Sequence, residues 1–146
     1  MANNRTLTAA NAIILISVAG LFDVAQRLQG FSADDITETD AIEPTETSMG
    51  IDGRLSAGFV PVAVRQSITL QADSQSNDFF ENWFAAEQTI REKYVASGTI
   101  IIPATSRKYD LTRGFLRGYV SLPSLKKTLQ PRRYMLDWER VTPAPY

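Results

Sequence analysis

A run of carboxylates between residues 34 and 52 is the part of the sequence that could most directly bind a ligand. Hard cations such as Ca²⁺ prefer several carboxylate oxygens, but the glycines and glutamates here do not follow the spacing of an EF-hand loop. Acidic segments of this kind are more often solvated or face a partner, which is the interpretation we adopt. The segment has no lysine or arginine, and its acidic residues are Asp34, Asp35, Glu38, Asp40, Glu43, Glu46 and Asp52.

The last third of the chain has the opposite charge. Two basic pairs close to aromatic residues could form a nucleic-acid surface. The pI of about 5.4 and the lack of a known nucleic-acid motif argue against a dedicated binder, and favour strand residues that meet an acidic neighbour. The basic residues after Pro103 are Arg107, Lys108, Arg113, Arg117, Lys126, Lys127, Arg132, Arg133 and Arg140, and the nearby aromatic residues are Tyr119, Tyr134 and Trp138.

Histidine and cysteine are both absent. Their absence excludes histidine general bases, cysteine nucleophiles, disulfides and the common zinc sites. A carboxylate-only or lysine-based enzyme remains an alternative, and it would require a concave site with a strongly shifted Asp or Glu pKa. No acidic residue lies in a recognisable catalytic motif, and there is no phosphate loop or dinucleotide fingerprint. We therefore predict that the protein is not an enzyme, and we assign no catalytic residue, metal ligand or cofactor.

The elements that position these charged regions are predicted to be mostly strands. A length of 146 residues fits a single domain spanning 1–146. The apolar stretch from Ala12 to Phe22 is too short to span a bilayer, and its Ile and Val content favours a first core strand over a signal peptide. After a turn at 20–23, further strands are predicted near 24–31, 59–72, 99–102, 109–122 and 128–141.

The acidic segment is poor in large apolar residues and ends at an Asp52-Gly53 turn signal. It predicts a long projecting β-hairpin or loop over about residues 34–58. We expect residues 38–54 to be mobile in a free subunit, because so little apolar area can be buried there to offset the ordering entropy.

One helix is predicted over about residues 77–96, because aromatic residues recur there at helical spacing. Ser76 is the expected N-cap and Gly98 the expected left-handed exit. The aromatic face could line a ligand pocket, but core packing is the expected role; it contains Phe79, Phe80, Trp83 and Phe84. The predicted fold class is α+β, mainly β: an antiparallel β-sandwich or barrel with this one flanking α-helix.

Five stretches carry a resemblance to a known family. They are NAIILISVAGLF, QGFSADDI, ETSMGIDGRLSAGFVPV, SITLQADSQSNDFFENWF and KKTLQPRRYMLDWE. In this order, an apolar N-terminal strand precedes an acidic hairpin, an aromatic helix and a basic C-terminal hairpin. Over nearly its whole length, the chain resembles the tail tube proteins of contractile-tailed (myovirus-type) bacteriophages, whose fold is related to bacteriocin and type VI secretion tube proteins.

The resemblance implies a structural subunit of the virion. Six copies would form a ring, and stacked rings would form a hollow tube that conducts DNA during ejection without specific binding. The implied partners are other copies of the chain, a tail sheath, a baseplate or tube initiator and a tail terminator, with assembly in the host bacterial cytoplasm and no membrane insertion. The alternatives are the tube of a contractile bacteriocin or type VI-like injection system and, more distantly, a monomeric β-barrel binding module.

A head-to-tail contact joins two different patches of one subunit, and an acidic and a basic segment on one chain could supply such a pair. Apolar side chains of the hairpin would dock on the adjacent ring, while its carboxylates meet basic residues. The residues predicted at this contact are Glu43, Glu46, Met49, Ile51, Asp52, Leu55, Arg132 and Arg133.

Overall fold

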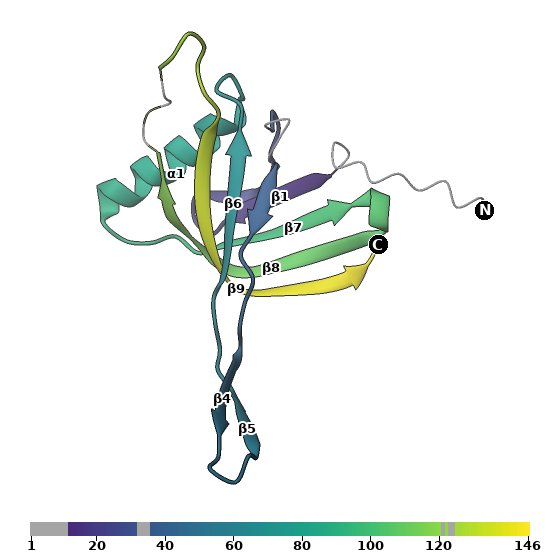
Figure 1. Cartoon of the computed structure of the whole chain (residues 1–146). Helices are drawn as coiled ribbons and strands as arrows, with labels where there is room; N and C mark the ends of the chain where they lie inside the picture. Colours follow the sequence, from purple (N-terminus) through teal and green to yellow (C-terminus); the bar gives the residue numbers. More distant parts are fainter. Residues whose placement is uncertain (1–11, 32–35, 121, 123–124) are drawn as a thin grey trace, which may run out of the picture.

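A computed structural model describes residues 12–31, 36–120, 122 and 125–146 (Figure 1). Within these residues, strands dominate and one α-helix is present. The strands are β1 (Ile13–Val18), β2 (Phe22–Arg27), β3 (Thr37–Thr39), β4 (Thr45–Met49), β5 (Leu55–Phe59), β6 (Val64–Leu70), β7 (Ala96–Ile102), β8 (Arg107–Tyr119) and β9 (Arg132–Pro145). The helix is α1 (Ser76–Ile90), and a short 3-10 turn spans Pro103–Thr105.

Seven strands form one antiparallel sheet in the order β2-β1-β7-β8-β9-β6-β3. The sheet curls, and the chain after β2 closes it at one end. There, the backbone N of Leu28 donates to the Ile14 carbonyl of β1 at 2.9 Å, and Gln71, just after β6, donates to the Gly30 carbonyl at 2.8 Å. The predicted class, a mainly β protein with a barrel-like sheet and a flanking helix, is therefore confirmed.

The core lies between the concave sheet and α1, which crosses one flank of it (Figure 1). Alternate residues of β1 are fully buried, as expected for the first core strand. On the helix, the rings of Phe79, Phe80 and Trp83 are buried, and Phe80 stacks on Tyr134 of β9 with ring centroids 4.1 Å apart. The aromatic helix face thus serves mainly as core.

The helix ends differ from the prediction. It stops at Ile90, and Arg91 takes the left-handed conformation with φ 57°, so the predicted end at residue 96 is wrong. The cause is the buried carboxylate of Glu87, which accepts hydrogen bonds from the backbone N of Tyr94 at 3.1 Å and from Lys93 Nζ at 3.0 Å, and so turns the chain back early. Gly98 lies in β7 instead, where an added Cβ would come within 2.7 Å of a β1 carbonyl oxygen.

The start of the helix also has a different cap. Gln75 occupies the N-cap position without a side-chain cap bond, and Ser76 is the first helical residue. The Ser76 hydroxyl instead accepts a hydrogen bond from the backbone N of Gln29 at 2.7 Å. The predicted N-cap therefore ties the helix to the chain after β2, which is a tertiary contact that local spacing does not reveal.

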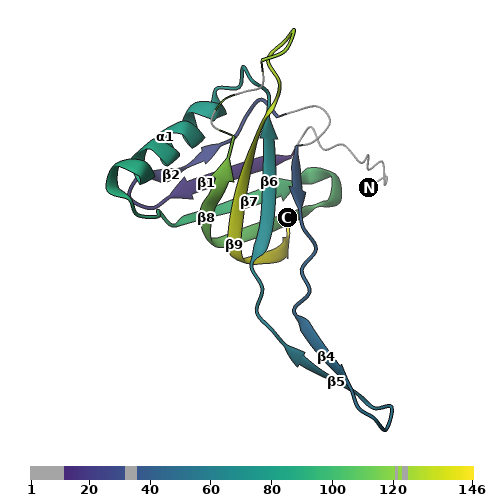
Figure 2. The same cartoon turned by 60° about the vertical axis from the view of Figure 1, so that its left-hand side comes forward.

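The predicted hairpin is present and stands away from the sheet (Figures 1 and 2), but the predicted range of about 34–58 is too long, because Thr37–Thr39 forms β3 and pairs with β6 in the main sheet. Strands β4 and β5 pair only with each other, in a five-residue register from Thr45↔Phe59 to Met49↔Leu55. A five-residue loop closes it, in which Gly53 has φ 83° and the Asp52 carboxylate accepts from the backbone N of Arg54 at 3.1 Å. The Asp-Gly signal therefore marks the tip correctly, although the loop is longer than a two-residue turn.

Candidate interaction surfaces

The hairpin tip, defined here as Met49 to Leu55, presents apolar side chains to solvent. Met49 is 64% exposed, Leu55 is 59% exposed and Ile51 is fully exposed. Exposed apolar groups clustered on a projecting element mark an interaction site more often than a free surface. These three residues of the predicted interface are thus exposed, and their contact with another chain stays a prediction.

The carboxylates of the predicted interface are exposed along the same hairpin. Glu43 lies in the stem, Glu46 on β4 and Asp52 in the tip, where it also shapes the turn. In the described part of the chain, no three acidic side chains come together as a metal-binding group. Glu38 and Asp40, nearer the sheet, are also exposed, and the other two acidic residues of the segment, Asp34 and Asp35, lie outside the described residues.

The two predicted basic partners occupy opposite faces of β9. Arg132 is buried, and its guanidinium pairs with Glu81 of α1, donates to the Val120 carbonyl at 3.3 Å and lies 5.6 Å from the centre of the Tyr134 ring. Arg133 is exposed and donates to the Ser67 hydroxyl at 3.2 Å. Arg132 thus makes its contacts within its own subunit, whereas Arg133 lies on the surface.

This placement follows from the alternation of strand side chains. Arg132 shares a face of β9 with Tyr134, Leu136 and Trp138, all of which are buried, while Arg133 points to the other side. The run of aromatic and aliphatic residues at every second position was the signal in the sequence that could have separated the two arginines.

Tyr134 anchors a polar network inside the core. Its hydroxyl donates to the Asn77 side-chain oxygen at 2.7 Å, and the Asn77 amide donates to the Gln71 carbonyl at 2.9 Å. Burial raises the pKa of Tyr134 to about 12, against the opposing effect of the Arg132 charge. Burial likewise raises the pKa of Tyr119. Because Tyr134 and Trp138 are buried, they are not available to stack on bases, which weakens the nucleic-acid alternative.

Between β8 and β9, the described residues form a second exposed apolar surface. We call the described residues Leu122 and Leu125 to Leu129 the leucine loop. Leu122 is 75% exposed, Leu125 is 79% exposed and Leu129 is 55% exposed. Lys126 and Lys127 lie between the last two leucines, and both are exposed. In the sequence these lysines are recognisable only as charges, and no local pattern marks the leucines around them as exposed.

A groove of about 720 Å³, which we call the stem groove, lies where the hairpin stem leaves the sheet. One wall is the chain that descends toward β4 and returns after β5, and the other is formed by β7, β8 and β9. Its lining is mostly apolar, and it includes Ile42, Phe59, Val62, Ile102, Tyr109 and Trp138.

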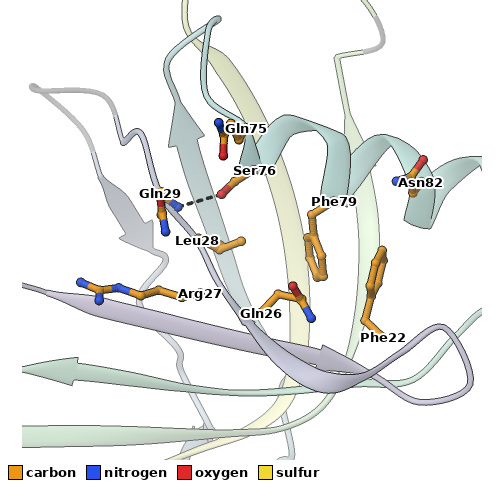
Figure 3. Close-up of a pocket in the computed structure, with 9 residues that line it drawn as sticks. All are labelled: Phe22, Gln26, Arg27, Leu28, Gln29, Gln75, Ser76, Phe79 and Asn82. Carbon is orange, nitrogen blue, oxygen red and sulfur yellow. Dashed lines mark hydrogen bonds between the residues drawn. The ribbon is translucent and has the colours of Figure 1, made fainter.

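A smaller cleft of about 250 Å³ lies between β2 and α1 (Figure 3). The rings of Phe22 and Phe79 face each other in it, with centroids 4.7 Å apart. Its polar lining consists largely of amide side chains, Gln26, Gln29, Gln75 and Asn82, with Arg27 as its single charged residue. It contains no carboxylate, so it offers no acid or base for catalysis.

Among the described residues, no helix is long and apolar enough to cross a membrane.

The family model described as Tail fiber protein gp32 matches residues 5–142. This match spans most of the chain, so the protein belongs to that family. A comparison with curated proteins finds no match.

The fold is shared with solved proteins of contractile injection systems. A chain of the PVC sheath-tube complex, from an extracellular contractile injection system in its extended state, has a TM-score of 0.55 and 16% identity over 91% of this chain and 88% of that one. A chain of the tube-terminating cap of the anti-feeding prophage has a TM-score of 0.58 and 16% identity over 100% and 95%. A chain of the anti-feeding prophage baseplate has a TM-score of 0.56 and 8% identity over 92% of each chain.

Proposed function

We propose that the protein is the structural subunit of a phage tail tube. Six copies form a ring, and rings stack into a hollow tube that conducts DNA during ejection. The observation that carries this proposal is a barrel of the tube-protein fold from which an acidic hairpin with an exposed apolar tip projects into solvent. Such a projection buries nothing in its own subunit, so its apolar side chains are explained by a contact between subunits.

The family description names a tail fiber protein, which is consistent with a component of a phage tail. We assign the tube because the tube-protein fold accounts for nearly the whole chain.

Ring closure would use the two free edges of the seven-stranded sheet. Strands β2 and β3 each pair on one side in the described part of the chain, so their outer edges can accept a strand of a neighbouring copy. Because the similar structures come from a sheath-tube complex, a tube-terminating cap and a baseplate, we propose that the partners of the tube are a sheath, a terminator and a baseplate. The site of action is the phage tail, after assembly in the bacterial cytoplasm.

The tube should hold DNA loosely. A conduit that bound phosphates tightly would slow the genome, because every neutralised phosphate adds to the affinity. A lumen of mixed or negative charge would instead keep the duplex moving. In a gel-shift assay at physiological salt, we expect no submicromolar complex with duplex DNA.

Removal of the hairpin tests the proposal. The backbone N of Val60 donates to the Pro44 carbonyl at 2.8 Å, so Thr45 to Phe59 can be replaced by a short glycine linker without disturbing the sheet. We expect a folded, soluble subunit that no longer forms tubes. A matched control keeps the hairpin but replaces exposed Thr47 by Ser, and should assemble normally. If the deletion variant still forms normal tubes, the hairpin is not the connector between rings.

A second candidate is the tube of a contractile bacteriocin or type VI-like injection system. It is favoured by the likeness to proteins of extracellular injection systems, which covers most of the chain. Both candidates predict tubes, and they differ in what passes through them. Particles purified from the producing cell would contain a DNA-filled head in the first case and no genome in the second.

A further inference from the structure

The leucine loop lies at the end of the molecule away from the hairpin, whose stem lines the stem groove. In two views, the β8–β9 connection is at the end away from the β4–β5 hairpin (Figures 1 and 2). The loop therefore cannot reach the groove of its own subunit. A second copy displaced along the long axis would bring one copy's loop to the other's groove, which is a heterologous contact that repeats without limit along a filament.

The two surfaces are complementary in shape and polarity. The loop is a projection with three leucines that are more than half exposed, and the loop residues Leu125 and Leu129 pair with each other across it. The groove is a concavity of about 720 Å³ with an apolar floor that includes Ile102, Tyr109 and Trp138. Apolar surface removed from water on both sides stabilises such a contact.

Their charges are also complementary. The loop carries Lys126 and Lys127. The charged residues of the groove lining are Asp40, Glu139 and Arg140, which leave one net negative charge, while Glu43 lies beside the groove in a smaller hollow that Asp40 and Arg65 also line. A charge pattern of this kind selects the partner and its orientation more than it adds affinity.

We propose that the leucine loop of one copy seats in the stem groove of a second copy of this chain, and that this contact joins adjacent rings in addition to the contact of the hairpin tip. The inference rests on the proposed tube function. It identifies the leucine loop as the surface of the adjacent copy that the hairpin end of the subunit contacts. In this contact Lys126 and Lys127 meet carboxylates of the adjacent ring, which is the role that the sequence predicted for Arg132.

Engineered disulfides test the contact directly, because the chain contains no cysteine of its own. The variant L125C/V62C places one thiol on the loop and one in the groove lining. After assembly and mild oxidation, non-reducing gels should show a ladder of covalent oligomers. The matched control L125C/Q88C has its second thiol on an exposed position of α1 and should remain largely monomeric.

Charge reversal provides a second readout. K126E/K127E should raise the protein concentration needed for tube formation by about tenfold or more, since like charges would then face each other. Adding D40K/E43K in the same chain should restore most of the loss. Circular dichroism and thermal unfolding of the unassembled subunits should be unchanged, because all four side chains are exposed.

The outcomes separate this inference from the proposed function. If wild-type protein forms tubes but L125C/V62C crosslinks no better than L125C/Q88C, the loop does not seat in the groove while the tube function stands. Crosslinking together with charge rescue would support both. If wild-type protein forms no assembly at any concentration, with or without nucleating tail proteins, both are wrong.

Discussion

The adjacent arginines of β9 offer a matched pair of substitutions with opposite expected effects. Arg132→Met removes a buried guanidinium that pairs with Glu81 and donates to the Val120 carbonyl. Arg133→Met removes an exposed guanidinium whose described contact is one hydrogen bond of 3.2 Å to Ser67. We expect the first substitution to destabilise the subunit and the second to leave its stability nearly unchanged.

The magnitude follows from what each change leaves behind. Breaking a fully buried ion pair costs about 3–5 kcal/mol, because the remaining charge is stranded. Glu81 is 48% exposed and can be rehydrated, so that full cost does not apply. Arg132→Met also removes charged hydrogen bonds and the cation–π contact with Tyr134, and these losses together should lower the free energy of unfolding by about 2–3 kcal/mol. An exposed substitution such as Arg133→Met should stay within about 0.5 kcal/mol.

Urea unfolding followed by circular dichroism measures both values. The substitutions should be made in the hairpin-deleted background, so that self-association does not add to the apparent stability. The midpoint should fall for Arg132→Met at an unchanged slope, and Tm should drop by roughly 4–12 °C, given about 2–4 °C per kcal/mol in a domain of this size. Equal destabilisation by both substitutions would show that the assignment of Arg132 to the core is wrong.

Three further predictions concern the core. Gly114→Ala places a Cβ 2.2 Å from the Trp138 ring, so it should cost about 1–3 kcal/mol in urea unfolding, whereas Gly58→Ala, which meets nothing within 4 Å, should not. The pKa of Tyr134 is raised to about 12 in the folded protein, so the unfolded chain loses this proton at a lower pH than the folded chain does. The free energy of unfolding should therefore keep its full value below pH 10 and fall by about 2 kcal/mol toward pH 12. Tyr134→Phe should reduce this fall when unfolding is measured over the same pH range. Glu87→Gln leaves one side-chain oxygen to accept from three donors, which are Trp83 Nε1, Lys93 Nζ and the backbone N of Tyr94. Amide hydrogen exchange at the C-terminal end of α1 should therefore become faster, whereas the same substitution at a surface glutamate would leave the exchange rate unchanged.

Local patterns in the sequence predicted most of the elements. The alternating burial of β1, the aromatic face of α1 and the Asp52-Gly53 tip of the hairpin all follow from residue periodicity or turn chemistry. The strands from β7 onward occur where they were expected, with shifted ends. For example, β9 runs from Arg132 to Pro145, because its last residues pair with β8.

What the sequence could not predict depends on contacts between distant residues. The helix ends early because Glu87 accepts the backbone N of Tyr94, and Gly98 is needed because β1 passes close to it. Arg132 was grouped with Arg133 by charge, although its buried position depends on Glu81, 51 residues away. The stem groove is assembled from β3, β6, β7, β8 and β9 together with the hairpin stem, so no local segment reveals it.

Electron microscopy of the concentrated, purified chain tests the central claim most directly. We expect hollow tubes of uniform diameter whose cross-sections show six-fold rings, with the hairpin of each subunit reaching the next ring. Addition of a baseplate initiator should lower the concentration at which they appear. If sedimentation finds only a 16.2 kDa monomer at every concentration, with and without nucleating tail proteins, the chain is not a tube subunit.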